Sequence, residues 1–173
     1  MDSLFGRRFE SAHLHNLIPM KIFTTALCTA LFLTGACCSS TPETTGVRKE
    51  VRTATASNTA PFSQGIEANG FLFISGTLGV EATTGMLAGD DVVSQLTQIV
   101  KNISQILEEA GSSLKDVVKA TVFLTDMQNY AAMNEAYLTL FQAPYPARTC
   151  VEISRLPRAG ALIEVEVIAV KGK

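Results

Sequence analysis

Histidine and cysteine are scarce in this sequence, and their positions exclude two common kinds of catalytic site. Both histidines, His13 and His15, precede the part of the chain that shows the periodicity of a folded domain. Only Cys150 lies within that part, and the other cysteines are Cys28, Cys37 and Cys38. No Cys and His combination has the spacing of a metal site, and a domain without histidine cannot form a Cys–His nucleophile pair. We therefore expect neither a bound metal nor a nucleophilic thiol.

An excess of positive charge is also lacking. The chain carries 14 Lys and Arg against 16 Asp and Glu, which gives a net charge of -2 and a pI near 5.7. A protein that binds nucleic acid or an anionic membrane surface needs Lys and Arg in excess to neutralise phosphate groups. Nucleic acid is therefore not an expected partner.

The N-terminal part of the chain has the layout of a targeting segment. Met20 and Lys21 precede an uncharged, mostly apolar run over residues 22–34. The run is shorter than the ~20 residues that a membrane-spanning helix needs, so a secretory signal is the better interpretation. We expect a signal peptide over residues 20–38, with Met20 as the true start and residues 1–19 as an extension or a mis-assigned start.

The end of this segment resembles the lipobox of bacterial lipoproteins, in which a Cys after small residues receives diacylglycerol. Leu33 lies four residues before Cys37, whereas the lipoprotein pattern has it three before. A lipidated Cys37 would attach the exported or periplasmic protein to the membrane. Signal cleavage without lipidation, or an uncleaved extension on a cytosolic protein, are the alternatives. Residues 39–48, rich in Ser, Thr and Pro, are expected to form a linker to one domain over residues 49–173.

Apolar periodicity predicts the elements of this domain. Residues 92–110 place their apolar side chains on one stripe of a helix, which Asp90 or Asp91 can cap and Gly111 can end. Asp126 can cap a second helix, which the prolines at 144 and 146 stop, and whose predicted apolar face is Tyr130, Met133, Tyr137, Leu138 and Phe141. Strands are expected over residues 51–56, 71–75, 117–124, 147–153 and 161–170, and Asn58, Pro61 and Gly65 are expected to break the chain between the first two. This order predicts an α+β fold, a mixed sheet with both helices packed on one face.

The last two strands predict what the other face of the sheet does. Side chains alternate between faces along a strand. The apolar sets expected under the helices are Thr149, Val151 and Ile153 in one strand and Ile163, Val165, Val167 and Ala169 in the other. The opposite sets mix charged and apolar residues: Arg148, Cys150 and Glu152, and Glu164, Glu166, Ile168 and Val170. Such a face fits either a subunit interface with polar pockets or a half-wetted surface with an Arg148–Glu164 pair.

Several of these segments resemble the RidA (YjgF) family. The most specific is Tyr145–Pro157, which reads YPARTCVEISRLP, followed by the strand IEVEVIAV over Ile163–Val170. Shorter matches are Phe71–Gly76, Thr121–Asp126 and Met133–Tyr137. The resemblance spans roughly residues 49–173. It implies a chorismate-mutase-like fold that assembles as a homotrimer with a ligand pocket at each subunit boundary.

The same resemblance implies an activity and the residues that perform it. Family members hydrolyse 2-imino acids, such as 2-iminobutanoate and 2-iminopropanoate, to 2-oxo acids and ammonia, with no cofactor and no metal. Arg148 would bind the substrate carboxylate in a bidentate manner, as a planar guanidinium does well. Glu164 would position or activate the attacking water and transfer protons to the departing ammonia. Arg148 and Glu164 should thus converge on one cavity between subunits.

The remaining site residues carried over from the family are Cys150, Ser75, Gly76, Asn134 and Phe62. Cys150 would contribute mainly backbone groups, while Ser75, Gly76 and Asn134 would line the wall and Phe62 would close the mouth. Phe62 departs from the family pattern, which has Tyr at this place, and cannot donate a hydrogen bond.

Simpler interpretations of these residues stand beside the functional ones. Arg148 could serve only in an interface ion pair, Cys150 could be a small buried hydrophobe, and Asn134 a helix-surface amide. Glu166, two residues after Glu164, is interpreted as structural. The stripe of Tyr130, Met133 and Tyr137 is interpreted as core.

Three functions follow from these observations. The first is imine deamination, and the second is a noncatalytic module in which the Arg148 pocket captures a small carboxylate such as a 2-oxo acid. The third is the endoribonuclease or translation-inhibitor activity attributed to some relatives, which the acidic pI and the absence of histidine from the domain disfavour.

The predicted export can be tested on the protein recovered from cells. Mass spectrometry of the intact chain should find an N-terminus created by cleavage within residues 20–38, with an added lipid mass if Cys37 is acylated. Recovery of the uncleaved N-terminus would contradict export.

Overall fold

The computed structural model describes residues 47–171, which lie within the compact unit Pro42–Lys173. The predicted extension over residues 1–19, the signal peptide over 20–38 with its lipobox, and nearly all of the linker over 39–48 lie outside the described residues. Of the helices within residues 47–171, none combines the length and the apolar character needed to cross a membrane.

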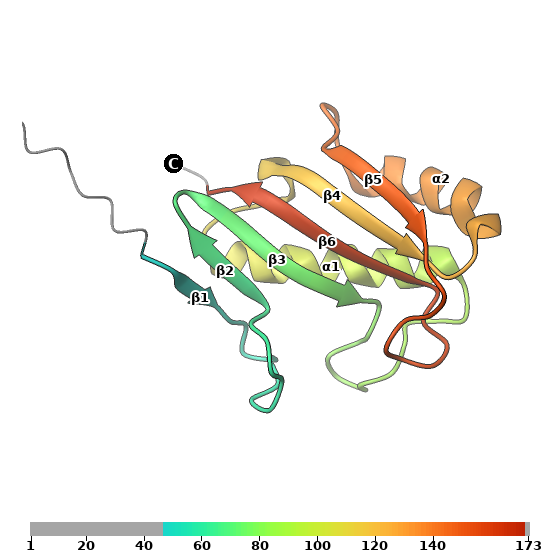
Figure 1. Cartoon of the computed structure of the whole chain (residues 1–173), viewed down its shortest axis with the longest axis horizontal. Coiled ribbons are helices and arrows are strands. Elements are labelled where there is room, and N and C mark those ends of the chain that lie inside the picture. The colour runs from blue at the N-terminus through green and yellow to red at the C-terminus, as the bar shows by residue number, and fades with distance from the viewer. Residues whose placement is uncertain (1–46, 172–173) are drawn as a thin grey trace, which may run out of the picture. The chain divides into compact units, whose positions relative to one another are not determined.

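One six-stranded sheet organises the domain (Figure 1). Its strands are β1 (Lys49–Val51), β2 (Gly65–Ala68), β3 (Phe71–Leu78), β4 (Val117–Leu124), β5 (Ala147–Glu152) and β6 (Ile163–Val170), in the spatial order β1-β2-β3-β6-β4-β5. All neighbours pair antiparallel except β4 and β5, which are parallel. The helices α1 (Val92–Glu109) and α2 (Tyr130–Leu140) lie behind the sheet in this view. The predicted mixed α+β fold with two helices on one face is therefore confirmed.

Helix α1 provides most of the helical part of the core. The Asp91 carboxylate accepts hydrogen bonds from the backbone N–H groups of Val93 and Ser94, so it caps the helix as predicted. Gly111, just after the helix, has φ 74°, a left-handed conformation that glycine adopts without steric cost. The buried face of α1 consists of Val92, Gln95, Leu96, Ile99, Val100, Ile103, Ile106 and Leu107.

The prediction was less accurate before Phe71. The strand expected over residues 51–56 ends at Val51, and β2 was not predicted because Gly65 was interpreted as a chain break. Gly65 is in fact a buried strand residue. A Cβ placed on it would lie 3.0 Å from the Ile74 side chain and 3.3 Å from that of Ile106. Glycine therefore permits β2 to approach β3 and α1 closely, rather than ending the strand.

The predicted apolar face of α2 is correct for three of its five residues. Met133, Tyr137 and Phe141 are buried, but Tyr130 and Leu138 are 40% and 58% exposed. Asp126 accepts a hydrogen bond from the N–H of Gln128, and so caps a short 3-10 turn (Met127–Asn129) that leads into α2. Helix α2 lies behind the β5 edge of the sheet (Figure 1), and Tyr130 and Leu138 on its sides remain in contact with solvent.

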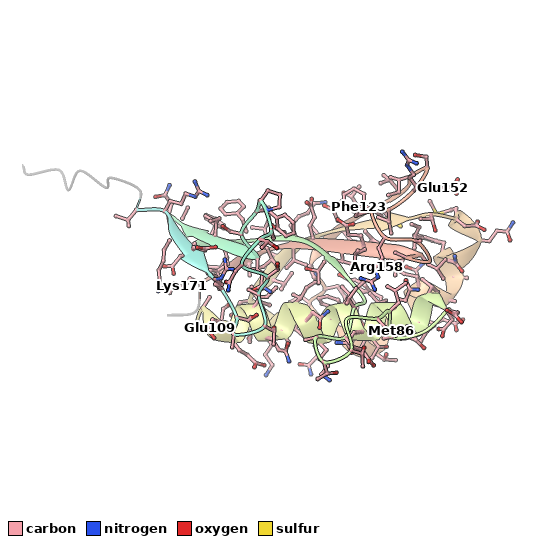
Figure 2. The ribbon with its side chains drawn as sticks, turned by 90° about the horizontal axis from the view of Figure 1, so that it is seen from below. Met86, Glu109, Phe123, Glu152, Arg158 and Lys171 are labelled. Carbon is pink, nitrogen blue, oxygen red and sulfur yellow. The ribbon has the colours of Figure 1, made fainter. Side chains whose placement is uncertain are left out.

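The face of the sheet away from the helices is rich in apolar side chains. Phe123 projects from this face in Figure 2, whereas its neighbours along β4, Val122 and Leu124, are fully buried under the helices. Pairing places four exposed apolar side chains on the same open face, namely Phe71, Phe73, Val151 and Val170. An open face with several exposed apolar side chains is typical of a surface that another chain covers. The predicted subunit interface stays a prediction.

A buried glutamine joins the two loops that flank this framework. The Gln95 amide donates to the carbonyl oxygens of Gly89 (2.9 Å) and Gly160 (3.0 Å) and accepts from the N–H of Leu162 (2.9 Å). Gln95 is fully buried, so all three backbone groups depend on it for a partner. It thereby fixes the start of β6 against α1.

Replacing Gln95 by Leu should destabilise the protein strongly, because the carbonyl groups of Gly89 and Gly160 and the N–H of Leu162 would lose a fully buried hydrogen-bond partner. We expect a loss of about 2–4 kcal/mol in the free energy of unfolding, measured by urea denaturation. The control Thr97→Val removes an exposed hydroxyl contact to the Val93 carbonyl on the same helix and should change stability by less than about 0.5 kcal/mol. Equal stability of Gln95→Leu and the wild type would contradict this role.

Candidate functional site

Arg148 lies on the edge strand β5, and its side chain points toward the helices. In the register of the sheet, Arg148 is opposite Ala120 on β4, which is in turn opposite Val167 on β6. Ala120 and Val167 are both buried under the helices. Because residues opposite one another in a sheet share a face, Arg148 belongs to the helix-covered face.

Four side chains of α2 surround the Arg148 guanidinium. One amino group donates a short hydrogen bond to the Asn134 side-chain oxygen, and the other lies 3.7 Å from the Met133 sulfur. The guanidinium carbon is 4.6 Å from the centre of the Tyr137 ring and 6.0 Å from that of Tyr130. The ion pairs found within residues 47–171 do not include Arg148, so no acidic side chain there neutralises this half-buried cation.

A depression next to the guanidinium gives access to it. Its volume is ≈ 420 Å³, and it is lined by Asn134, Tyr137, Leu138, Tyr145, Pro146 and Arg148. A small carboxylate can enter a space of this size. An unneutralised guanidinium at its wall is a strong binding group for such an anion, since charge-assisted hydrogen bonds are stronger than neutral ones.

Glu164 lies on the other face of the sheet. It is opposite Phe123 on β4 and Leu78 on β3, and it alternates along β6 with the buried residues Ile163 and Val165. Burial raises the pKa of the Glu164 carboxyl, and repulsion from the nearby Glu166 raises it further. A carboxyl with a raised pKa holds a proton more readily than a free one, which suits it to accept and return a proton during a reaction.

These positions correct the predicted arrangement within one chain. The sequence pattern placed Arg148, Cys150 and Glu164 on one face, but Arg148 and Cys150 share the helix face and Glu164 points to the open face. The error lies in strand 147–153, where Val151, expected under the helices, is exposed on the open face. Hydropathy fails here because β5 is an edge strand under the rim of α2. There an arginine can bury its stem and stack on aromatic rings while its charged end reaches solvent.

Gly76 brings β3 into contact with the Glu164 carboxylate. A Cβ added at residue 76 would lie 1.9 Å from a Glu164 carboxylate oxygen, so only glycine leaves room for the carboxylate at its observed position. Gly76 and Ser75 also line a hollow of ≈ 310 Å³, together with Phe62 and residues of α1. Three of the predicted site residues, Phe62, Ser75 and Gly76, thus line one hollow, and Glu164 adjoins Gly76.

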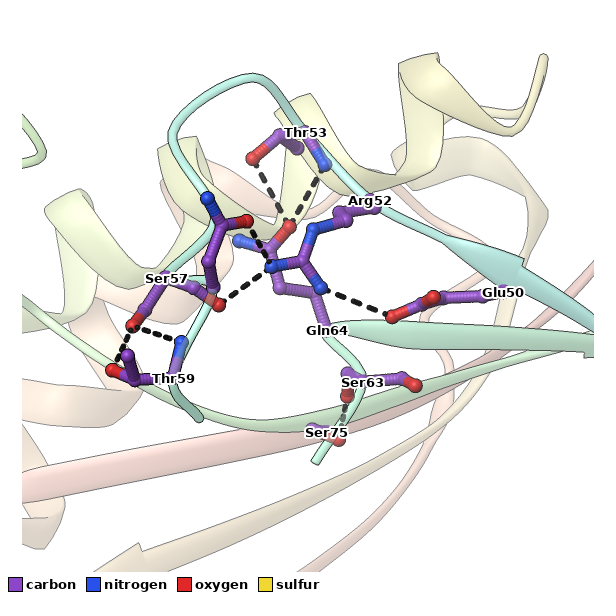
Figure 3. Close-up of polar contacts among 9 residues, drawn as sticks. Glu50, Arg52, Thr53, Ser57, Thr59, Ser63, Gln64 and Ser75 are labelled. Atoms are coloured by element: carbon purple, nitrogen blue, oxygen red, sulfur yellow. Dashed lines mark hydrogen bonds and ion pairs between the residues drawn. The ribbon is translucent and has the colours of Figure 1, made fainter. Parts of the chain in front are cut away.

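Phe62 lies on the loop before β2, where it lines this hollow and is 61% exposed. The Gln64 side-chain oxygen accepts hydrogen bonds from the N–H (2.8 Å) and the hydroxyl (3.0 Å) of Thr53, as Figure 3 shows. The Ser75 hydroxyl donates to the Ser63 carbonyl (2.7 Å). Ser75 therefore fixes the loop, and its hydroxyl proton is already used.

Cys150 does not have the character of a nucleophile. It is half-buried and packs against the core, and burial raises the pKa of its thiol, although Arg148 opposes this effect. A thiol held in its protonated form is a poor nucleophile. Within residues 47–171, no three His, Cys, Asp or Glu side chains form a cluster that could hold a metal ion.

The structure thus divides the predicted site residues into two groups. Arg148, Asn134 and Cys150 gather near the β5 edge and α2, and Phe62, Ser75, Gly76 and Glu164 gather around the end of β3. The contacts of Tyr130, Met133 and Tyr137 with Arg148 were not predicted, because the stripe that these three residues form is also typical of a core. Their spacing with Asn134, at i, i+3, i+4 and i+7, is the pattern that places four side chains on one face of a helix.

Comparison with known proteins shows what the chain is similar to. Residues 53–171 match the model of the family described as Endoribonuclease L-PSP. The 2-iminobutanoate/2-iminopropanoate deaminase of Mus musculus is 39% identical over 127 residues, 73% of this chain and 93% of the mouse protein. A RutC family protein of Pyrococcus horikoshii is 49% identical over 111 residues, 64% of this chain and 87% of that protein. The crystal structure of E. coli TdcF with bound serine covers 72% of this chain and 99% of its own, with a TM-score of 0.66 and 36% identity.

The raised pKa of Glu164 predicts a pH-dependent effect of Glu164→Gln. In the folded protein the carboxylate form is disfavoured, so the wild type loses stability as pH rises through this raised pKa. Glutamine carries no charge, and the variant should match the wild type below about pH 4 and melt at a higher temperature near pH 7. Glu109→Gln, which removes an exposed carboxyl on α1, serves as the matched control. Identical melting temperatures of Glu164→Gln and wild type across this range would contradict the assignment.

Proposed function

This chain belongs to the Endoribonuclease L-PSP family, also called the RidA or YjgF family, and from that premise we propose that it hydrolyses 2-imino acids to 2-oxo acids and ammonia. The single observation that carries the proposal is the unneutralised Arg148 guanidinium at the wall of a depression sized for a small anion. A relative that is 39% identical over nearly its whole length is named 2-iminobutanoate/2-iminopropanoate deaminase, which supports the choice of substrate class.

In this proposal the complete site forms between two copies of the chain. Arg148 and Glu164 project to opposite faces of one sheet, so a single copy cannot present both groups to one small substrate. A second copy that sets its β3 end beside the β5 edge of the first would bring Glu164 and Gly76 near Arg148. The open apolar face, with Phe73 and Val151, offers the surface for such an association. We propose a homotrimer, the assembly typical of the family.

The proposed binding step uses Arg148. Its guanidinium forms paired hydrogen bonds to the substrate carboxylate and so fixes the orientation of the adjacent C=N group. The Asn134 side chain, which accepts a hydrogen bond from the guanidinium, helps to keep it in place. Lysine could supply the charge but not the paired geometry.

The proposed chemical step uses Glu164. The carbon of the protonated imine is electrophilic. As the oxygen of a water molecule bonds to this carbon, Glu164 accepts a proton from the water. The carboxyl then returns the proton to the nitrogen of the tetrahedral intermediate. The C–N bond breaks and ammonia leaves as the C=O bond forms, and the Glu164 carboxylate accepts the hydroxyl proton. That proton then passes to ammonia in solvent, which gives ammonium and regenerates the carboxylate. One positioned proton carrier and a fixed substrate suffice for this reaction.

A deaminase assay with matched variants tests the proposal. Purified protein is given 2-iminobutanoate, generated in place from 2-aminobutanoate by an amino-acid oxidase, and release of 2-oxobutanoate is compared with buffer alone. Wild type should accelerate release. Arg148→Ala should lower kcat/KM by at least about 100-fold through the loss of paired charged hydrogen bonds, and Arg148→Lys should fall between them. Glu164→Gln should lower kcat by about 100-fold or more while KM changes little.

Two results would contradict the proposed deaminase. Release no faster than in buffer, together with Arg148-dependent binding of 2-oxobutanoate, would replace the deaminase with a noncatalytic carboxylate-binding module. Wild-type rates in Arg148→Ala would remove the basis of the proposal altogether.

A further inference from the structure

Arginine side chains at binding sites have many rotamers, so something must hold a half-buried guanidinium in one orientation before the substrate arrives. In this protein the acidic side chains within residues 47–171 do not perform this task, since none forms an ion pair with Arg148. The question is which neighbour fixes the plane of the guanidinium.

The neighbour with the closest stacked contact is Tyr137. The guanidinium carbon of Arg148 lies 4.6 Å from the centre of the Tyr137 ring, within the range of a cation–π interaction. The Tyr137 ring also stacks on the Phe141 ring, since the two ring centres are 4.3 Å apart and their planes differ by 17°. Tyr137 and Phe141 are both buried, so the ring that Arg148 touches is itself held by packing.

The Tyr137 hydroxyl forms no hydrogen bond with Arg148. It is a buried oxygen with no hydrogen-bond partner among the described residues, which carries a cost in stability. Burial raises the pKa of the phenol, an effect that Arg148 opposes, so the hydroxyl keeps its proton and is no anionic partner for the guanidinium. The ring, rather than the hydroxyl, is the part of Tyr137 that acts on Arg148.

We propose that Tyr137 is a positioning residue whose ring, backed by Phe141, holds the plane of the Arg148 guanidinium so that its free donors face the depression beside α2. Asn134 fixes one end of the group, and Tyr137 fixes its plane. Substrate then binds without first ordering the arginine, and this lowers the entropy cost of binding. The inference rests on the proposed function, because it takes Arg148 as the group that binds the carboxylate.

Two substitutions separate the ring from the hydroxyl, and both are made in the full chain. Tyr137→Phe keeps the ring and removes a buried hydroxyl without a partner, so it should keep the wild-type KM within about twofold and melt no lower than wild type. Tyr137→Leu removes the ring, and should raise KM for 2-iminobutanoate by about tenfold with a smaller change in kcat. Tyr130→Leu should have a weaker effect than Tyr137→Leu, because the Tyr130 ring is 6.0 Å away and partly exposed.

A readout that needs no catalysis is the position of the guanidinium itself. Protons stacked over an aromatic ring are shielded, so the Arg148 side-chain resonances in arginine-labelled protein should be shifted upfield in wild type and in Tyr137→Phe. Binding of 2-oxobutanoate, measured by calorimetry, should be about tenfold weaker in Tyr137→Leu than in Tyr137→Phe. If Tyr137→Leu fails to fold, the Arg148 resonances of wild type and Tyr137→Phe still show whether the guanidinium stacks on the aromatic ring.

The outcomes distinguish this inference from the proposed function. Unshifted Arg148 resonances in wild type, equal binding by Tyr137→Leu and wild type, or equal losses in Tyr137→Phe and Tyr137→Leu would each overturn the positioning role of the ring. Absence of turnover in wild type, with a shifted Arg148 and ring-dependent binding of 2-oxobutanoate, would overturn the deaminase and support the inference. Absence of turnover and of 2-oxobutanoate binding, whatever the resonances, would overturn both.

Discussion

A β-strand sends successive side chains to opposite faces of its sheet, and this alternation governs where the two ionised groups of the site can meet. Arg148 on β5 is in register with the buried Ala120, and Glu164 on β6 is in register with Phe123 on the open face. Moving Glu164 to the helix face would require a one-residue slip of β6, which would also turn the buried Ile163 and Val165 toward the open face. The core therefore holds the guanidinium and the carboxyl apart within one chain.

Arg148 and Glu164 each carry a charge that is partly buried and has no partner of opposite charge among the described residues. Arg148 is half-buried beside aromatic rings without an acidic partner among the described residues, and Glu164 is half-buried with a raised pKa. Partial removal from water disfavours both charges, and in the proposed assembly they would face one cavity and the substrate it holds. In that proposed assembly, association and catalysis would be linked, because packing of the open apolar faces would also bring the two charges together.

The features predictable from sequence were those that periodicity or a specific motif determines. The stripe on α1 and its Asp91 cap are strong signals, and the Tyr145–Pro157 segment carries the family resemblance with Arg148 in it. Features that depend on neighbours from distant parts of the chain were not predictable. Gly65 was interpreted as a break because the side chains that crowd it come from β3 and α1.

The site shows the same division. Hydropathy assigned Val151 to the core face and Arg148 to the other, because no local signal tells an edge strand under a helix rim from a central strand. The spacing of Tyr130, Met133 and Tyr137 is as typical of a core stripe as of a surround for a cation, so only the position of β5 distinguishes the two.

In the proposed assembly, one copy supplies Arg148 and another supplies Glu164 to each site. Mixing two inactive variants, Arg148→Ala and Glu164→Gln, in equal amounts under conditions that exchange subunits tests it most directly. A site shared between copies predicts recovery of about a quarter of the wild-type deaminase rate, since that share of sites joins an intact Arg148 to an intact Glu164. A mixture of exchanged subunits that stays as inactive as its two components would contradict the account.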